Sequence, residues 1–180
     1  QVGTAFEQGN LAFIPLGDWA PQLQRMIDLR NTLGLRSPIH SLARLLNPLN
    51  ARCGLQSIFH PGYQGVHRDA SGLLGDTAIV VKGDGGEIEV NPDVISHLYG
   101  TTAGEAWDEE WPALSERRHV KPPSLQAEHL LAFWRGEVED SYGEKALIAT
   151  MALALRGLGQ HREQAFVTAQ GYWDTRNISI

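Results

Sequence analysis

The sequence is short of the residues that build disulfide frameworks and thiolate metal sites. Its 180 residues include one cysteine, Cys53, so no intrachain disulfide can form and no zinc site with several thiolates can be built. This cysteine usage is typical of a reducing compartment, and we expect a cytoplasmic protein. No apolar run reaches the roughly 20 residues needed to span a bilayer, so we expect no membrane partner.

An excess of basic charge is lacking too. The formal net charge is −6, with 20% charged and 42% hydrophobic residues, which is ordinary for a globular domain with a sizeable core. This balance argues against a chain that binds nucleic acid with its whole surface. The sum hides an asymmetry, since 25–52 contains five arginines and one acid, whereas 105–116 contains five acids and no base. We interpret both stretches as solvated faces.

Short apolar runs alternate with helical patterns along the chain. The runs at 11–16, 54–59 and 77–81 predict buried strands, and the last is the clearest because it is apolar and rich in β-branched residues. Apolar spacing and capping residues predict helices, which cover about 18–31, 39–46, 63–74, 125–134, 142–158 and 162–173. The stretch 91–121 is irregular in pattern. Strands alternating with helices predict an α/β domain with a mainly parallel sheet flanked by helices.

Two stretches carry a family resemblance. The first is Leu29-Arg-Asn-Thr-Leu-Gly-Leu-Arg-Ser37, followed by Leu46-Asn-Pro-Leu49. The second is Ala78-Ile-Val-Val-Lys-Gly-Asp-Gly-Gly-Glu-Ile-Glu-Val90. Their order and spacing, from about Gly9 to Gly159, resemble the anthranilate phosphoribosyltransferase family (glycosyl transferase family 3), in a divergent branch that does not act on anthranilate.

The resemblance implies a C-terminal α/β domain of the nucleoside phosphorylase/phosphoribosyltransferase type over residues 1–180. In the family this domain packs on a small N-terminal helical domain, which would also form a homodimer. Phosphoribosyl pyrophosphate and a small acceptor would bind between the two domains. The glycine-rich pyrophosphate loop and the Lys-His-Gly-Asn-Arg loop of the family lie upstream and are missing from this sequence. We therefore expect a piece of a longer protein, inactive as an isolated chain.

The same resemblance suggests substrate and metal residues. Arg30 matches the family arginine that holds an acceptor carboxylate, and a guanidinium suits that task because it pairs with a carboxylate through two hydrogen bonds. Asn47 is the second expected substrate residue. Asp84, Glu87 and Glu89 stand near the family's adjacent Asp-Glu pair and are the expected Mg²⁺ ligands. The alternative for these acids is a solvated loop, and the alternative for Arg30 is a helix cap.

A competing hypothesis is a nucleic-acid-binding protein that keeps the fold without the transferase activity. The stretches Phe59-His-Pro-Gly-Tyr63 and Lys82-Gly-Asp-Gly-Gly-Glu-Ile-Glu resemble a DNA-binding branch of the same family. In that case phosphates would be contacted by basic residues, namely Arg36, Arg44, Arg117, Arg118 and Lys121.

Overall fold

The computed structural model describes residues 6–7, 9–83, 88–119 and 126–179. They divide into two compact units, 1–46 and 47–180, and each unit is described by itself. No described helix is both long and apolar enough to cross a membrane.

The first unit consists of short helices. These are α2 (Leu16–Trp19), α3 (Pro21–Asp28), α4 (Arg30–Leu33), α5 (Ile39–Leu42) and the 3₁₀-helix η1 (Ala43–Leu45). The helices predicted over 18–31 and 39–46 are therefore confirmed, but each is divided into shorter helices. Gly34 ends α4 with a left-handed φ of 68°, as glycine favours.

The strand predicted over 11–16 is wrong. Residues 11–15 have no regular structure, and Leu11 and Phe13 are 86% and 88% exposed. A strand needs a neighbour for its backbone N–H and C=O groups, and the described part of this unit offers none. The apolar composition of the run was not sufficient to form a strand.

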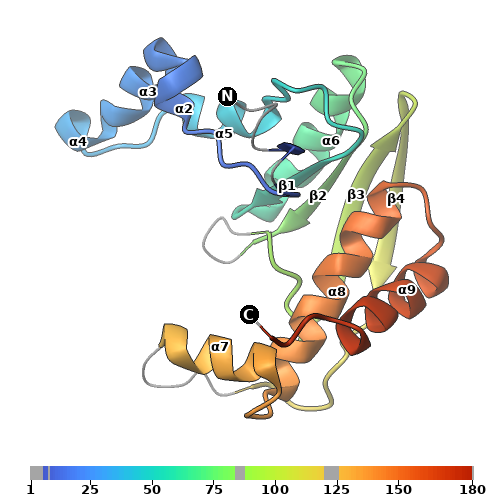
Figure 1. Ribbon diagram of the computed structural model, residues 1–180. Coiled ribbons are helices and arrows are strands. Elements are labelled where there is room, and N and C mark those ends of the chain that lie inside the picture. Colours follow the sequence, from blue (N-terminus) through green and yellow to red (C-terminus); the bar gives the residue numbers. More distant parts are fainter. Residues whose placement is uncertain (1–5, 8, 84–87, 120–125, 180) are drawn as a thin grey trace. The chain divides into compact units, whose positions relative to one another are not determined.

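The second unit is built on a four-stranded sheet in the order β1-β2-β3-β4. Figure 1 shows its strands, which are β1 (Gly54–Ile58), β2 (Ala78–Lys82), β3 (Ser96–Thr102) and β4 (Glu105–Trp111). The α/β class and the strands predicted over 54–59 and 77–81 are confirmed. The sheet is mixed rather than mainly parallel, however, because only β1 and β2 pair in parallel, whereas β2–β3 and β3–β4 are antiparallel pairs.

The two strands missing from the sequence prediction form a hairpin. Ala103 and Gly104 connect β3 to β4 with φ angles of 52° and 82°, as expected for the two-residue turn that suits antiparallel strands. The acids of β4 have low strand propensity, which hid this strand in the irregular stretch. Its signal was the alternation that places Trp107 and Trp111 on one face.

Strand β2 lies inside the sheet, as predicted. Ile79 and Val80 are fully buried. Helix α6 (Gln64–Leu73), which follows the 3₁₀-helix η2 (Pro61–Tyr63), covers one face of the sheet, and α8 (Ser141–Gly157) covers the other (Figure 1). Helices α7 (Ala127–Arg135) and α9 (Arg162–Asp174) complete the α8 side and confirm the three predicted C-terminal helices.

The apolar core lies between the sheet and α8. Ile79 and Val81 of β2 pack with the small and branched residues of α8, among them Ala149 and Leu153, both fully buried. Gly157 lets the end of α8 approach β1, because a Cβ there would lie 2.4 Å from Cys53 Sγ. Small residues on α8 thus allow close contact between helix and sheet.

Helix α6 packs with its polar side inward. Its buried residues are Gln64, His67 and Ser71. His67 Nδ1 lies 3.0 Å from Gln56 Oε1 on β1, and Gln56 Nε2 donates to Ser71 Oγ over 2.9 Å. These contacts pair the buried side chains of Gln56, His67 and Ser71, whose polar groups would otherwise be costly to bury.

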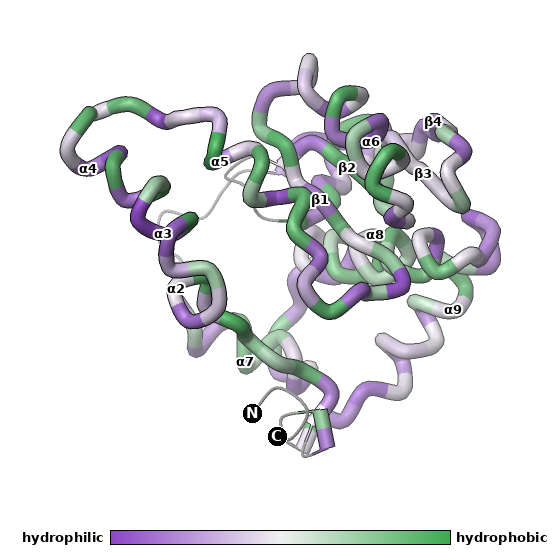
Figure 2. The backbone as a smooth tube through the Cα atoms, turned by 90° about the horizontal axis from the view of Figure 1, so that it is seen from above, coloured by the Kyte–Doolittle hydropathy of each residue, from purple (hydrophilic) through white to green (hydrophobic). Residues whose placement is uncertain are grey.

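The apolar side of α6 faces outward. Val66, Leu73 and Leu74 are 58%, 91% and 63% exposed, and hydrophobic residues are visible along α6 in Figure 2. The outer side of α6 therefore carries exposed apolar side chains.

The inverted packing of α6 predicts an unusual mutational pattern. We expect His67→Leu to lower the free energy of unfolding by about 1–3 kcal/mol, because it leaves Gln56 Oε1 buried without a donor. The matched control Leu73→Lys, on the outer side, should change it by less than about 0.5 kcal/mol. Urea unfolding of the chain measures both, and a larger loss for Leu73→Lys would contradict this packing.

Candidate functional site

The carboxyl ends of the parallel pair β1–β2 lie at one edge of the sheet. Ile58 is opposite Lys82, and the backbone N–H of Gly83 donates to Ile58 O over 3.2 Å. In α/β sheets such an edge is where ligands bind. Of the predicted metal ligands, Asp84 and Glu87 lie outside the described residues.

Glu89, the third predicted ligand, is an exposed carboxylate beside the start of α8. The Tyr142 hydroxyl donates to Glu89 Oε1 over 3.3 Å. The next residue is held against the same helix, because Val90 N–H donates to Thr150 Oγ1 over 3.0 Å. Asp140 caps α8 through its Oδ1, which accepts from Gly143 N, and this fixes the turn that presents Tyr142.

A second segment meets Glu89 at the same place. The His119 ring stacks on Tyr142 with 4.8 Å between ring centroids, and the backbone N–H of His119 donates to Asp93 Oδ2. Two predicted nucleic-acid contacts, Arg117 and Arg118, precede this anchored residue and are exposed. Tyr142 and Asp93 could not be predicted from the sequence, because neither belongs to a motif and both are brought here by tertiary packing.

The described residues test the expected magnesium site only in part. No cluster of three or more His, Cys, Asp or Glu residues among them could hold a metal ion. Glu89 suits Mg²⁺ by donor type, because its carboxylate is exposed and Mg²⁺ needs only one or two protein carboxylates. The complete ligand set stays a prediction.

The predicted substrate residues lie in different units. Arg30 begins α4 in the first unit, and its side chain is exposed. Asn47, in the second unit, anchors the turn before β1: its Oδ1 accepts from Ala51 N over 2.7 Å and its Nδ2 donates to Asp76 Oδ1 over 2.9 Å. These bonds give Asn47 a structural role, and its role in substrate binding stays a prediction.

The other predicted nucleic-acid contacts are scattered. Arg36 is exposed in the first unit, and Arg44 is half-buried in η1. Lys121 lies outside the described residues.

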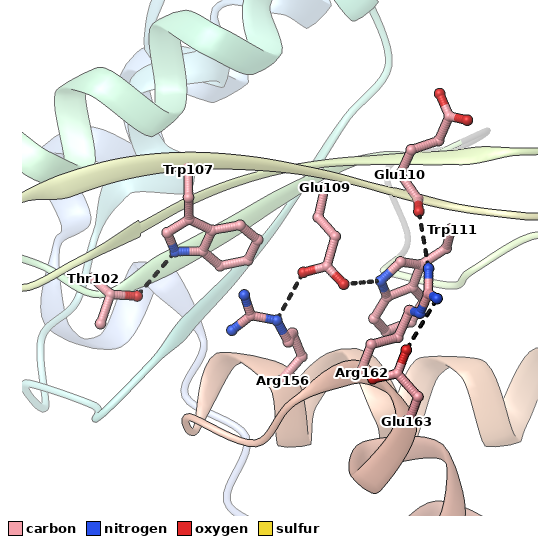
Figure 3. A network of polar contacts seen from close by, with 8 residues as sticks. All are labelled: Thr102, Trp107, Glu109, Glu110, Trp111, Arg156, Arg162 and Glu163. Atoms are coloured by element: carbon pink, nitrogen blue, oxygen red, sulfur yellow. Dashed lines mark hydrogen bonds and ion pairs between the residues drawn. The ribbon is translucent and has the colours of Figure 1, made fainter.

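Glu109, one of the acids of β4, is neutralised by Arg156 of α8. Arg156 Nε donates to Glu109 Oε2 over 2.8 Å, and its guanidinium carbon lies 4.2 Å from the centre of the Trp107 ring. The other oxygen of Glu109 accepts from Trp111 Nε1 over 2.8 Å. Figure 3 shows Arg156 between Trp107 and Glu109. Because Arg156 and Glu109 are about three-quarters covered, this pair is stronger than an exposed one.

Cys53 does not serve as an activated nucleophile. Burial raises the pKa of its thiol above the ordinary value, and a hydrogen bond with the backbone of Ile79 offsets this only in part. A thiol that stays protonated at neutral pH is a weak nucleophile.

The β4 network depends on a glycine in β3. Gly100 is directly opposite Trp107, and a Cβ at position 100 would lie 2.1 Å from the indole ring. We expect Gly100→Ala to displace the ring from Arg156 and to destabilise the chain by about 1–3 kcal/mol. Unfolding in urea and the Trp107 indole N–H signal in NMR check this. An unchanged Trp107 signal with unchanged stability would contradict the close packing.

Comparison with other proteins gives partial matches. No family model matches the chain. It is 35% identical over 85 residues to an uncharacterized protein of Aquifex aeolicus, covering 47% of this chain and 28% of that protein. It is 29% identical over 94 residues to the uncharacterized protein YbiB of Escherichia coli, covering 51% of this chain and 29% of YbiB. A third match, of 109 residues at 32% identity, is an anthranilate phosphoribosyltransferase of Stenotrophomonas maltophilia, with 60% of this chain and 30% of the enzyme covered.

More than half of this chain is similar to an anthranilate phosphoribosyltransferase. Enzymes of the same name from two Cupriavidus species and Polynucleobacter necessarius match at 32–33% identity. The chain spans less than a third of the length of these relatives. The similarity supports the predicted family, and the mixed sheet flanked by helices is consistent with the α/β domain of phosphoribosyltransferases.

Proposed function

We propose that this chain is the α/β domain of a glycosyl transferase family 3 protein whose full-length form transfers a phosphoribosyl group from phosphoribosyl pyrophosphate to a small acceptor other than anthranilate. The partial similarity to anthranilate phosphoribosyltransferases supports the reaction class. The observation that carries the site is the exposed carboxylate of Glu89, in the segment that follows the end of β2.

In this proposal the chain contributes charged side chains that bind the metal ion and orient the acceptor. Glu89, together with Asp84 and Glu87, would hold Mg²⁺, which when bound neutralises charge on the pyrophosphate leaving group. Tyr142 keeps the Glu89 carboxylate in place through its hydroxyl. The Arg30 guanidinium, exposed at the start of α4, would orient an acidic group of the acceptor.

The acids of this chain differ from the family pattern. Glu87 and Glu89 are separated by Ile88, whereas the family pair is adjacent. In an extended segment residues two apart point to the same side, and neighbours point to opposite sides. Glu87 and Glu89 would therefore point to one side, whereas the adjacent family pair points to two sides. This difference in metal-binding positions supports an altered substrate.

The metal role of Glu89 can be tested in the full-length parent protein. We expect Glu89→Gln to weaken Mg²⁺-dependent binding of phosphoribosyl pyrophosphate at least about tenfold, because it removes one charged ligand of a hard cation. Isothermal titration with and without Mg²⁺ measures this. Glu128→Gln, at an exposed acid of α7, is the matched control. Equal affinity of both variants and the parent would remove Glu89 from the metal site.

The isolated chain should be inactive toward anthranilate. It spans less than a third of its relatives, and its acids depart from the family pair. We expect no phosphoribosyl anthranilate when purified chain is incubated with both substrates and Mg²⁺. Product formation that disappears in Arg30→Ala would contradict this expectation.

Nucleic-acid binding is a second candidate, favoured by the anchored arginines. Arg117 and Arg118 are exposed beside His119, which is held by Asp93 and Tyr142. Such residues contact phosphates and not base edges, so binding would tolerate different sequences. The net charge of −6 makes this the weaker candidate.

Salt dependence tests the second candidate. In the full-length parent we expect Arg117→Ala/Arg118→Ala to lower the slope of log affinity against log salt by about 1.4 for single-stranded DNA, since each lost phosphate contact removes about 0.7. Mobility shifts at several salt concentrations measure the slope. Arg135→Ala/Lys145→Ala is a charge-matched control on α7 and α8. Identical slopes for both variants would exclude these arginines from a binding face.

A further inference from the structure

Burial alternates along the segment that follows β2. Val90 is 5% exposed and belongs to the apolar core, and Ile88 packs against the same core. Glu89, between them, is exposed. Because neighbouring residues of an extended segment point to opposite sides, the inward positions of Ile88 and Val90 direct the Glu89 side chain outward. The direction of the Glu89 carboxylate therefore depends on the contacts that hold the backbone beside it.

A hydroxyl group of α8 holds this backbone. The N–H of Val90 donates to Thr150 Oγ1 over 3.0 Å, and the Thr150 hydroxyl donates to Ala146 O, one turn earlier in the helix, over 2.7 Å. A threonine inside a helix often bonds the carbonyl of the preceding turn in this way. Its oxygen can still accept a hydrogen bond, and the Val90 N–H supplies one.

The surroundings of Thr150 are otherwise apolar. It is the one polar residue in the sequence between Ala146 and Leu155, and Ala149 and Leu153 beside it are fully buried. Apolar packing alone gives no reason for a hydroxyl at this position. Valine there would leave the partly buried Val90 N–H without this acceptor, which is unfavourable. The contact with the Glu89 segment accounts for the hydroxyl.

Tyr142 contacts the same segment from an earlier turn of α8. Its hydroxyl donates to Glu89 Oε1 over 3.3 Å. The Glu89 side chain and the backbone of Val90 are thus attached to separate points on one helix, which defines both the position and the direction of the carboxylate. Mg²⁺ requires nearly ideal octahedral geometry, so groups that orient its ligands affect how tightly it binds.

We propose that Thr150 is a positioning residue of the metal site. By accepting from the Val90 N–H it fixes the backbone beside Glu89, and thereby orients the Glu89 carboxylate toward Mg²⁺. This inference rests on the proposed metal role of Glu89. Thr150 acts through Glu89 and contacts neither the metal ion nor the substrate.

The effect on metal affinity can be measured in the full-length parent protein. We expect Thr150→Val to weaken Mg²⁺-dependent binding of phosphoribosyl pyrophosphate about fivefold to tenfold, at the lower end for residues that orient a metal ligand. Thr150→Ser keeps the hydroxyl and should restore the affinity. Thr168→Val is the matched control, since Thr168 is half-buried in α9 and accepts from the exposed Gln164 side chain. Isothermal titration with and without Mg²⁺ measures all three, and equal affinity of the two valine variants would overturn the positioning role.

A double-mutant cycle shows whether Thr150 acts through Glu89. In a Glu89→Gln background, Thr150→Val should weaken binding by less than about twofold, because residues that act through one another are not additive. The full effect of Thr150→Val in both backgrounds would overturn the inference. Parent-like affinity of Glu89→Gln itself would instead remove the metal role of Glu89, and the positioning role with it. Weak binding by Glu89→Gln with parent-like binding by Thr150→Val would defeat the positioning role alone.

Hydrogen exchange in the 180-residue chain tests the contact without metal or substrate. The Val90 amide should exchange at least about tenfold faster in Thr150→Val than in the wild type, as expected for a local loss of protection, and Thr150→Ser should keep the protection. Thr150→Ala, which suits a helix, serves the same purpose if valine unfolds the chain. An unchanged Val90 rate would overturn the contact, and so would an equal loss of protection along all of α8.

Discussion

Strand β2 must be covered on both faces, and the arrangement of the second unit follows from that requirement. Its side chains alternate, so that Val80 points to the α6 side and Ile79 to the α8 side. Leaving one such side chain in water would cost about 1.5–3 kcal/mol. Two helices are therefore needed, and the parallel β1 and antiparallel β3 complete the hydrogen bonding of both β2 edges.

The two faces of the sheet are covered by different kinds of side chain. On the α8 side apolar residues pack closely, helped by small side chains such as Ala149. On the α6 side Gln56, His67 and Ser71 form a buried polar network. A buried network of this kind is stable only when its members are paired, so the α6 face tolerates less substitution than an apolar face of equal size.

Helix α8 connects the candidate sites. Near its start Tyr142 holds Glu89 and stacks on His119. Near its end Arg156 ties α8 to β4 through Glu109 and Trp107. Between these points Ala149 packs in the apolar core. A displacement of α8 would therefore affect Glu89 and Glu109 together.

The sequence by itself determined the elements whose pattern is local. The β-branched run of β2, the three C-terminal helices and the glycine that ends α4 were predictable because each depends on neighbouring residues. The roles that the family motifs suggested for Arg30 and Glu89 stay predictions. Tertiary structure alone decided the antiparallel hairpin, the outward apolar side of α6 and the absence of a strand at Leu11. These features depend on which segments pair in the folded chain. The apolar character of a residue does not specify the segment against which it packs.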